Sequence, residues 1–299
     1  MPRAPSTVRD HWRRITRRFA AARLAFGHGT GSARDEAAWL VCSVLDIPFD
    51  DLNATLDRPV KKARAQRLEE LAGRRIDSRA PLAYLLKEAW LDGYRFYVDE
   101  RVIVPRSHIA ELLGDGLAPW ISSRESIGRV LDMCTGSGCL AVLAARAIPE
   151  ARIDATDVSE DALAVARINR DAYDLGDRLR LIQSDVFTAL HGERYDLILA
   201  NPPYVDARSM RELPAEYRHE PALALAGGSD GLDIVRRILR EAPEHLTERG
   251  ILVVEIGGNQ AALEAAYPQL PFTWLATHAG DEQVFLLDRS NLADPSLRS

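Results

Sequence analysis

The sequence has few of the features that mark secreted, membrane-spanning or metal-binding proteins. Its three cysteines, Cys42, Cys134 and Cys139, lack the spacing of metal ligands and cannot all pair with one another. No run of about eighteen apolar residues is present, which argues against a transmembrane helix. The seven histidines include no HExxH or similar pair, so no metal site is predicted. These absences favour a reducing compartment, and we expect a cytoplasmic protein without membrane contact.

Charge is distributed unevenly along the chain, whose net charge is −6. Residues 1–105 carry a net charge of +5, whereas residues 106–299 carry −11. The acidic part is unlike a surface that follows a phosphate backbone, and it favours a basic partner. A surface that is acidic only for solubility is the alternative interpretation.

Residues 1–88 are predicted to form a small helical domain. Apolar residues recur at helical spacing in three segments, residues 9–26, 33–46 and 60–76. The first segment is rich in arginine and poor in acid, which also fits an organellar transit peptide. We favour an amphipathic helix because one apolar stripe is present. Its members are Ile15, Phe19, Ala22 and Phe26.

Residues 89–105 alternate aromatic or β-branched residues with polar ones, which is typical of a β-hairpin, and we expect it to link two domains. Residues 106–299 then alternate apolar strand patterns with helical patterns. The predicted strands are residues 129–134, 153–158, 179–186, 195–200 and 251–257, followed by a hairpin of 272–279 and 283–288. Because most strands are apolar throughout, the pattern predicts an α/β domain with a largely parallel sheet covered on both faces.

The loop after the first of these strands has the residues of a nucleotide-binding turn. Gly136 and Gly138 allow the backbone to approach a ligand closely. Together with Ala141 they also fit a loose dinucleotide fingerprint. Asp132, at the end of the strand, suits an ammonium group better than a pyrophosphate, and the amino acid end of S-adenosylmethionine carries an ammonium group.

Two further strands of this domain end in aspartate. Asp157 follows Gly136 by 21 residues, a spacing typical of a carboxylate that accepts both ribose hydroxyls of NAD or S-adenosylmethionine. Asp185 can accept a hydrogen bond from an adenine amine while Val186 and Phe187 pack against the ring. A single aspartate in such a place is often only a turn former. Their repetition on successive strands favours cofactor binding.

The fourth strand ends in Asn-Pro-Pro-Tyr, residues 201–204. The amide oxygen of Asn201 and the carbonyl of Pro202 are two acceptors whose backbone is held rigid by proline. Two such acceptors can bind both N–H groups of a planar NH₂, and Tyr204 can stack on the flat group that bears it. The motif therefore predicts a clamp for a planar amine or amide, with a Pro-Pro turn capped by asparagine as the alternative.

These motifs resemble those of class I S-adenosylmethionine-dependent N-methyltransferases, which act on adenine N6 in nucleic acids or on glutamine N5 in proteins. Within that class, the chain is similar to the glutamine-N5 methyltransferases that modify ribosomal protein uL3 of the large subunit. The segments that carry this similarity are residues 81–113, 131–139, 199–206 and 216–239. The resemblance implies a Rossmann-like, mostly parallel seven-stranded sheet in residues 106–299, and it implies that the helical domain docks the substrate.

The resemblance also implies roles for individual residues. The loop lining the methionine end of the cofactor consists of Cys134, Thr135, Gly136, Ser137 and Gly138. Asp157 holds the ribose, and Asp185 lies at the adenine beside Val186. The glutamine amide is gripped by Asn201, Pro202, Pro203 and Tyr204, with Asn201 also beside the cofactor. Arg106 matches a family position near the active site.

The expected reaction relies on positioning, because an amide nitrogen is a poor nucleophile and no general base is evident beside the clamp. The nitrogen has to lie about 3 Å from the methyl carbon. Hydrogen bonds to Asn201 and Pro202 would stabilise the positive charge that develops on it.

Four alternatives remain open at this point. They are a glutamine-N5 methyltransferase acting on release factors, which typically has Gly in place of Cys134, an adenine-N6 nucleic-acid methyltransferase, an NAD-dependent oxidoreductase and a non-catalytic adaptor. The acidic second part of the chain argues against a nucleic-acid substrate. The basic first part leaves room for incidental contact with ribosomal RNA.

Overall fold

The computed structural model describes residues 6–121, 123–278 and 280–293, and the chain divides into two compact units. The helical unit comprises Met1–Ala89 and Leu213–His219, and the sheet unit comprises Trp90–Glu212 and Glu220–Ser299. The first boundary lies one residue from the predicted one. Residues 213–219 belong to the helical unit, whereas they are predicted from the sequence to lie in the α/β domain. Among the described residues, no helix is both long enough and apolar enough to cross a bilayer.

The helical unit is built from amphipathic helices with polar caps. Thr7 caps the first helix in a capping box with Asp10, and Ser32 caps the second. The first helix buries Ile15 and Phe19 as predicted, but it ends before Phe26. The elements are α1 (Val8–Ala21), α2 (Ala33–Leu45), η1 (Phe49–Asp51), η2 (Asn53–Thr55), α3 (Lys62–Ser78), α4 (Leu82–Leu86) and η4 (Ala215–His219).

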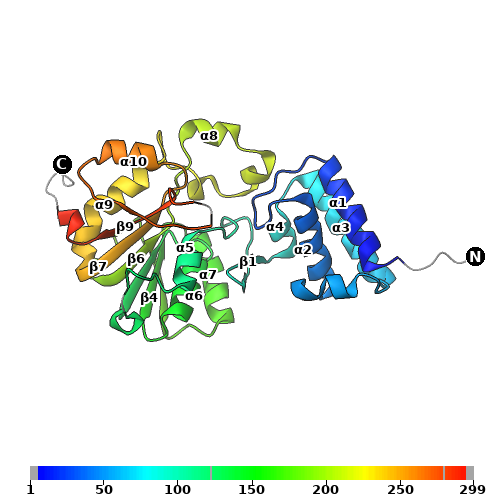
Figure 1. Ribbon diagram of the computed structural model, residues 1–299, viewed down its shortest axis with the longest axis horizontal. Coiled ribbons are helices and arrows are strands. Elements are labelled where there is room, and N and C mark those ends of the chain that lie inside the picture. Colours follow the sequence, from blue (N-terminus) through cyan, green and yellow to red (C-terminus); the bar gives the residue numbers. More distant parts are fainter. Residues whose placement is uncertain (1–5, 122, 279, 294–299) are drawn as a thin grey trace, which may run out of the picture. The chain divides into compact units, whose positions relative to one another are not determined.

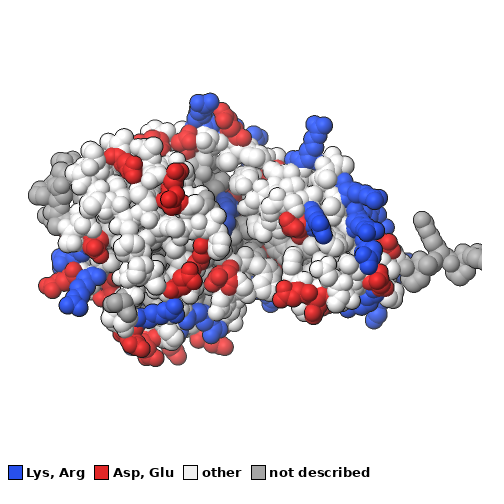
Figure 2. All heavy atoms as spheres, viewed as in Figure 1, with Lys and Arg blue, Asp and Glu red and all other residues white. Residues whose placement is uncertain are grey.

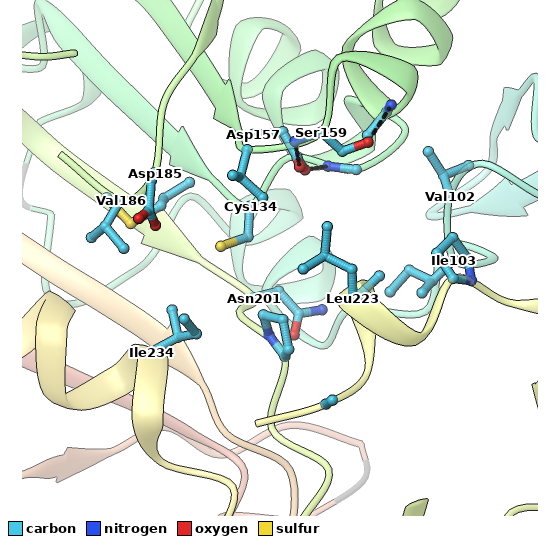
Figure 3. A pocket seen from close by; sticks show the side chains of 18 of the residues that line it. Val102, Ile103, Cys134, Asp157, Ser159, Asp185, Val186, Asn201, Leu223 and Ile234 are labelled. Atoms are coloured by element: carbon cyan, nitrogen blue, oxygen red, sulfur yellow. Dashed lines mark hydrogen bonds between the residues drawn. The ribbon is translucent and has the colours of Figure 1, made fainter. Parts of the chain in front are cut away.

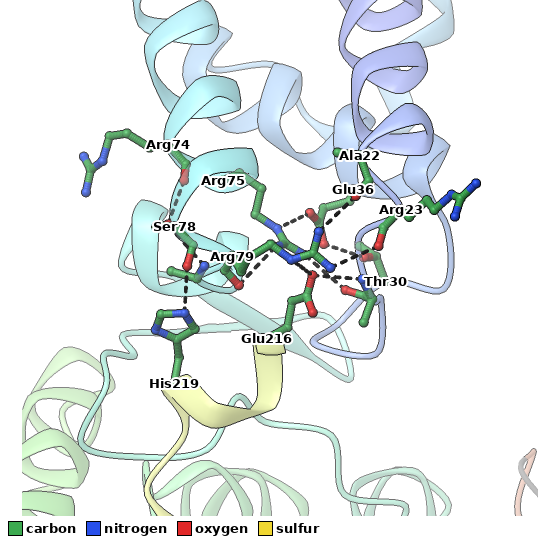
Figure 4. A network of polar contacts seen from close by, with 12 residues as sticks. Ala22, Arg23, Thr30, Glu36, Arg74, Arg75, Ser78, Arg79, Glu216 and His219 are labelled. Atoms are coloured by element: carbon green, nitrogen blue, oxygen red, sulfur yellow. Dashed lines mark hydrogen bonds and ion pairs between the residues drawn. The ribbon is translucent and has the colours of Figure 1, made fainter. Parts of the chain in front are cut away.

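A buried ionic network holds η4 within the helical unit (Figure 4). The side chains of Arg75, Glu36 and Glu216 are almost completely buried. Arg75 Nε donates to Glu36 Oε1 at 2.7 Å, and Arg79 Nε lies 2.9 Å from Glu216 Oε1. Ala25 N–H also donates to Glu216, at 3.0 Å. Because a buried charge is stable only when it is paired, these contacts fix residues 213–219 against the C-terminal end of α3 and against the segment between α1 and α2.

Basic side chains gather over α1 in the helical unit (Figure 2). Arg13 and Arg17 are exposed one turn apart on this helix. Arg14 and Arg18 share Glu69 of α3. The helix therefore presents a basic face, in agreement with the positive charge of this part of the sequence.

A short hairpin of β1 (Ala89–Leu91) and β2 (Tyr94–Phe96) follows the helical unit in the chain, and all of it except Ala89 belongs to the sheet unit. Asp92 and Gly93 connect its strands with φ values of 50° and 75°, as a type I′ turn requires. The predicted hairpin is thus confirmed at its first turn. It is shorter than predicted, because residues 97–105 contain no strand.

Within the described residues, seven strands form the main sheet in the order β5-β4-β3-β6-β7-β9-β8 (Figure 1). Its strands are β3 (Arg129–Met133), β4 (Arg152–Asp157), β5 (Leu179–Gln183), β6 (Tyr195–Ala200), β7 (Leu246–Glu255), β8 (Thr273–Trp274) and β9 (Val284–Asp288). The first five run parallel, whereas β9 is antiparallel to both β7 and β8. The largely parallel sheet and the terminal hairpin are confirmed, although Ala279 of the predicted hairpin lies outside the described residues.

Both faces of the sheet are buried under helices. Successive residues of β6, such as Leu197 and Ile198, belong to different apolar clusters, one on each face. The first cluster contains residues of α5 and α6, and the second contains residues of α9. The helices and 3₁₀ turns are α5 (Ile109–Gly114), η3 (Arg124–Ser126), α6 (Cys139–Ala147), α7 (Glu160–Ala172), α8 (Ala207–Glu212), η5 (Ala222–Ala224), α9 (Asp233–His245), α10 (Gln260–Ala266) and η6 (Asn291–Ala293).

The strand order places a topological switch point between β3 and β6. The chain proceeds from β3 outward through β4 and β5, and it then returns to β6 on the other side of β3. Ligands of parallel sheets bind outside the carboxyl ends of the strands at such a point. Apart from Arg106, the predicted site residues lie near the carboxyl ends of these four strands or in the loops that follow them.

Candidate active site

A cavity lies at the carboxyl ends of β3, β4 and β6 and beside the loop that follows β5. Figure 3 shows Asp185, Val186 and Ile234 on one side of it and Val102, Ile103 and Leu223 on the other. The predicted site residues among its lining are Cys134, Gly136, Asp157, Asp185, Val186, Asn201 and Pro203. The structure thus brings together residues that are up to 69 positions apart, as the resemblance implies.

The glycine loop after β3 is open to the cavity at one position and tightly packed at another. Gly136 has a φ of +53°, and no heavy atom lies within 4 Å of where its Cβ would be. Gly138 has a φ of +78°, and its Cβ would lie 3.2 Å from Cα of Ala166 in α7. The first glycine therefore leaves room for a ligand, and the second allows close helix packing. This cradle fits the expected S-adenosylmethionine.

Asp157 connects the glycine loop to the end of β4. Its Oδ2 accepts the N–H of Gly136 and its Oδ1 accepts that of Ser159, both at 2.9 Å. Burial raises the pKa of the Asp157 carboxyl despite these hydrogen bonds. The carboxylate faces the cavity with lone pairs to spare, as the predicted ribose contact requires.

Asp132 lies behind the loop and does not line the cavity. Its Oδ2 accepts hydrogen bonds from Thr135 Oγ1 and from the N–H of Ala141, so it braces the turn into α6. Within the described residues its Oδ1 has no hydrogen-bond partner. Burial raises the pKa of Asp132 to about 7. Asp132 therefore supports the glycine loop, and its Oδ1 could still bind a cation such as the predicted ammonium group. Two other predicted residues of the loop, Thr135 and Ser137, are also buried.

The side of the cavity where we expect the adenine combines an exposed carboxylate with a strained apolar residue. Arg237 Nη1 donates to Asp185 Oδ1 at 2.7 Å, and Asp185 Oδ2 has no partner among the described residues. Val186 is buried and has a φ of +52°, which is rare for a β-branched residue. Cys134, on the glycine loop, is likewise left-handed, with a φ of +58°. Such strain is often found at ligand sites.

The clamp residues follow β6. Asn201 and Pro203 line the cavity, and Pro202 between them is buried. Within the described residues, neither the Asn201 amide nor the Pro202 carbonyl has a hydrogen-bond partner. Tyr204 does not line the cavity; its hydroxyl lies 3.5 Å from Glu255 Oε1. The motif thus leaves two adjacent acceptors free, as a clamp for an NH₂ group requires.

Arg106 is engaged with the protein itself. Its Nη1 and Nη2 donate to the two carboxylate oxygens of Glu220 at 2.6 and 2.7 Å, and Nη1 also donates to Val104 O. The resemblance also implies that Arg106 binds the substrate, and this contact would have to share a guanidinium that already binds Glu220. The residues that sequence reasoning missed include Glu220, Glu255 and the rim segments 101–103 and 221–226. The similarity of residues 216–239 to the family was the signal for the second segment.

Comparison with known proteins agrees with this geometry. Residues 117–216 match the family model described as methyltransferase small domain, and residues 16–86 match the PrmC N-terminal domain. Over 293 residues the chain is 54% identical to the ribosomal protein uL3 glutamine methyltransferase of Burkholderia pseudomallei, covering 96% of this chain and 95% of that protein. It is 53% identical to the protein of the same name from Neisseria meningitidis serogroup A, with coverages of 96% and 94%.

A solved structure shows the same fold at low sequence identity. The hMettl16 catalytic domain, in complex with MAT2A 3'UTR hairpin 6, matches with a TM-score of 0.50 and 16% identity. The match covers 76% of this chain and 81% of that chain. At this identity the likeness concerns the class I methyltransferase fold alone.

Proposed function

Since this chain belongs to the family of ribosomal protein uL3 glutamine methyltransferases, we propose that it transfers a methyl group to the side-chain amide nitrogen, N5, of a glutamine in uL3. S-adenosylmethionine supplies the methyl group when it is bound. The observation that carries the proposal is a pair of adjacent acceptors without a hydrogen-bond partner among the described residues, namely the amide oxygen of Asn201 on the wall of the cavity and the carbonyl of the buried Pro202 next to it.

One group of residues in the site is proposed to bind the cofactor, and a second group is proposed to bind the substrate amide. The loop of residues 134–138 would accommodate the methionine end of the cofactor, Asp157 would accept the ribose hydroxyls, and Asp185 would accept from the adenine. Asn201 Oδ1 and Pro202 O accept the two N–H groups of the glutamine amide, which fixes the nitrogen and its lone pair in one direction. As the bond from the nitrogen to the methyl group forms and the methyl–sulfur bond breaks, the nitrogen gains positive charge, which both acceptors would stabilise until one of its two protons leaves to water.

Further parts of the protein suit this substrate. The basic face of α1 fits incidental contact with ribosomal RNA, if uL3 is modified while a ribosome assembles. All three cysteines are free, as in proteins of reducing compartments, and we place the reaction in the cytoplasm.

The test is to incubate the purified protein with radiolabelled methyl donor and, separately, free uL3, a release factor or adenine-containing nucleic acid. We expect label on uL3, and tandem mass spectrometry should locate it on a glutamine side chain. Label on the release factor alone would retain the chemistry but contradict the substrate. Label on nucleic acid alone would mean that the clamp binds adenine rather than glutamine.

A further inference from the structure

Glu255, the last residue of β7, is a buried carboxylate that the proposed methyl transfer does not use. Only 1% of its surface is exposed. Its Oε2 accepts Ser107 Oγ at 2.6 Å and the N–H of His108 at 2.8 Å, and its Oε1 lies 3.5 Å from the hydroxyl of Tyr204. One carboxylate thus joins the segment before α5 to the aromatic residue of the proposed clamp.

The turn that follows Glu255 contacts Tyr204 at two more points. A Cβ on Gly257 would lie 2.7 Å from Cε2 of the Tyr204 ring, and Gly257 has a φ of +54°, so no other residue fits there easily. Asn259 Nδ2 donates to the Tyr204 carbonyl at 2.8 Å. Residues 255–259 therefore contact the hydroxyl, the ring edge and the backbone of the same tyrosine.

These three contacts restrict the tyrosine in a way that suits its proposed task. A ring that stacks on a planar amide has to keep one orientation, and a tyrosine ring turns about only two side-chain bonds. Burial raises the pKa of Tyr204 well above its usual value, so the hydroxyl keeps its proton and remains a donor. Small errors in the placement of reacting groups lower the rate of positioned reactions strongly.

We propose that Glu255 is a positioning residue for methyl transfer, which fixes the ring of Tyr204 over the substrate amide by accepting a hydrogen bond from its hydroxyl. This inference rests on the proposed transfer to a glutamine amide. Asn259 supports Tyr204 as well, because its side chain donates a hydrogen bond to the backbone carbonyl of Tyr204. Glu255 acts through Tyr204 and touches neither the cofactor nor the amide.

A double-mutant cycle of Glu255→Gln and Tyr204→Phe tests the coupling. We expect each single variant to lower kcat for uL3 methylation by about tenfold, since each loses one hydrogen bond to a charged or buried partner. The double variant should be no slower than the slower single variant, because both changes remove the same contact. The Kd for S-adenosylmethionine, measured without uL3, should stay within twofold of wild type.

Two further variants separate positioning from a purely structural role. Ser107→Ala removes one of the other hydrogen-bond donors to the carboxylate, and we expect it to change kcat less than Glu255→Gln does. Glu248→Gln, an exposed glutamate of the same strand, is the matched control and should change nothing. If Glu255→Gln fails to fold, Glu255→Asp, which shortens the side chain that reaches the Tyr204 hydroxyl, provides the second cycle with Tyr204→Phe, with the same expectation of coupling.

Several results would overturn the inference. They are fold-changes in kcat that multiply in the double variant, a Glu255→Gln variant as fast as wild type, or an equal loss in Ser107→Ala. Each of these presupposes that the wild-type protein methylates glutamine. A wild-type protein that leaves uL3 unlabelled would instead contradict the proposed function itself.

Discussion

Glu220 and Arg106 lie 114 residues apart in the chain and join through two hydrogen bonds of 2.6 and 2.7 Å. The Glu220 side chain is completely buried, and its Oε1 also accepts the N–H of Val104 at 2.9 Å. Glu220 stands immediately before the rim segment 221–226 of the cavity. The pair therefore ties two segments next to the active site to each other.

The first prediction concerns the loss of this pair. Arg106→Ala should lower the free energy of unfolding by about 3 to 5 kcal/mol, because it removes a positive charge that balances the buried Glu220 carboxylate. The double variant Arg106→Ala with Glu220→Gln should recover part of this loss. Urea unfolding followed by circular dichroism measures both, with the exposed Arg167→Ala as the control. A variant of wild-type stability with only a higher KM for uL3 would instead show that Arg106 contacts the substrate.

The second prediction compares two glycines of the same loop. Gly136→Ala should weaken S-adenosylmethionine binding, because its Cβ enters open space beside the cavity. Its effect on stability should be about 1 to 2 kcal/mol, the cost of a left-handed alanine. Gly138→Ala should destabilise the fold more, because Ala166 is already close. Isothermal titration measures the cofactor affinity of both variants, and thermal unfolding measures their stability. Equal cofactor affinities in Gly136→Ala and wild type would contradict the predicted loss of binding.

The third prediction concerns pH and Asp132. Its carboxyl has a pKa of about 7 in the folded protein, against an ordinary value of 3.8. Between these values the folded protein holds a proton that the unfolded chain has lost, so the contribution of Asp132 to stability is complete below pH 3.8 and is lost as the pH rises through 7. Asp132→Asn removes this titration while its amide oxygen can still accept from Thr135.

The measurement is urea unfolding of both proteins at pH 5.5 and pH 8 without cofactor. We expect Asp132→Asn to gain stability relative to wild type as the pH rises, by up to about 1.4 kcal/mol per pH unit below pH 7. A constant difference across this range would contradict the raised pKa. A lower affinity of the variant for S-adenosylmethionine would support the contact with the ammonium group.

Much of the sheet and of the site could be predicted because the relevant patterns are local. Apolar runs ending in Asp157 or Asn201 identify both a strand and the edge at which its carboxyl end lies. Parallel strands bring such ends together, so their order along the chain suffices to predict a common site. The spacing of Gly136 and Gly138 is also a local pattern, and it predicts the loop that approaches the cofactor.

The remaining features depend on partners that are distant in sequence. The burial of Glu216 beside Arg75 assigns residues 213–219 to the helical unit, and no periodicity in this short segment indicates such a partner. Glu255 looks like any polar residue that ends a strand, and only the fold brings Ser107 and Tyr204 to it. Asp132 precedes a glycine loop as expected, but packing of α6 decides that its side chain lies behind the loop.

The central claim is that Asn201 holds the amide that receives the methyl group. The most direct test is to measure kcat for uL3 and the Kd for S-adenosylmethionine in Asn201→Ala and Asn201→Asp. We predict that Asn201→Ala lowers kcat by about a hundredfold or more while the Kd changes less than about twofold, because the lost acceptor acts on the nitrogen as it becomes positive. Asn201→Asp, which keeps acceptor oxygens, should retain more activity. Equal losses of turnover and cofactor affinity in Asn201→Ala would contradict the clamp.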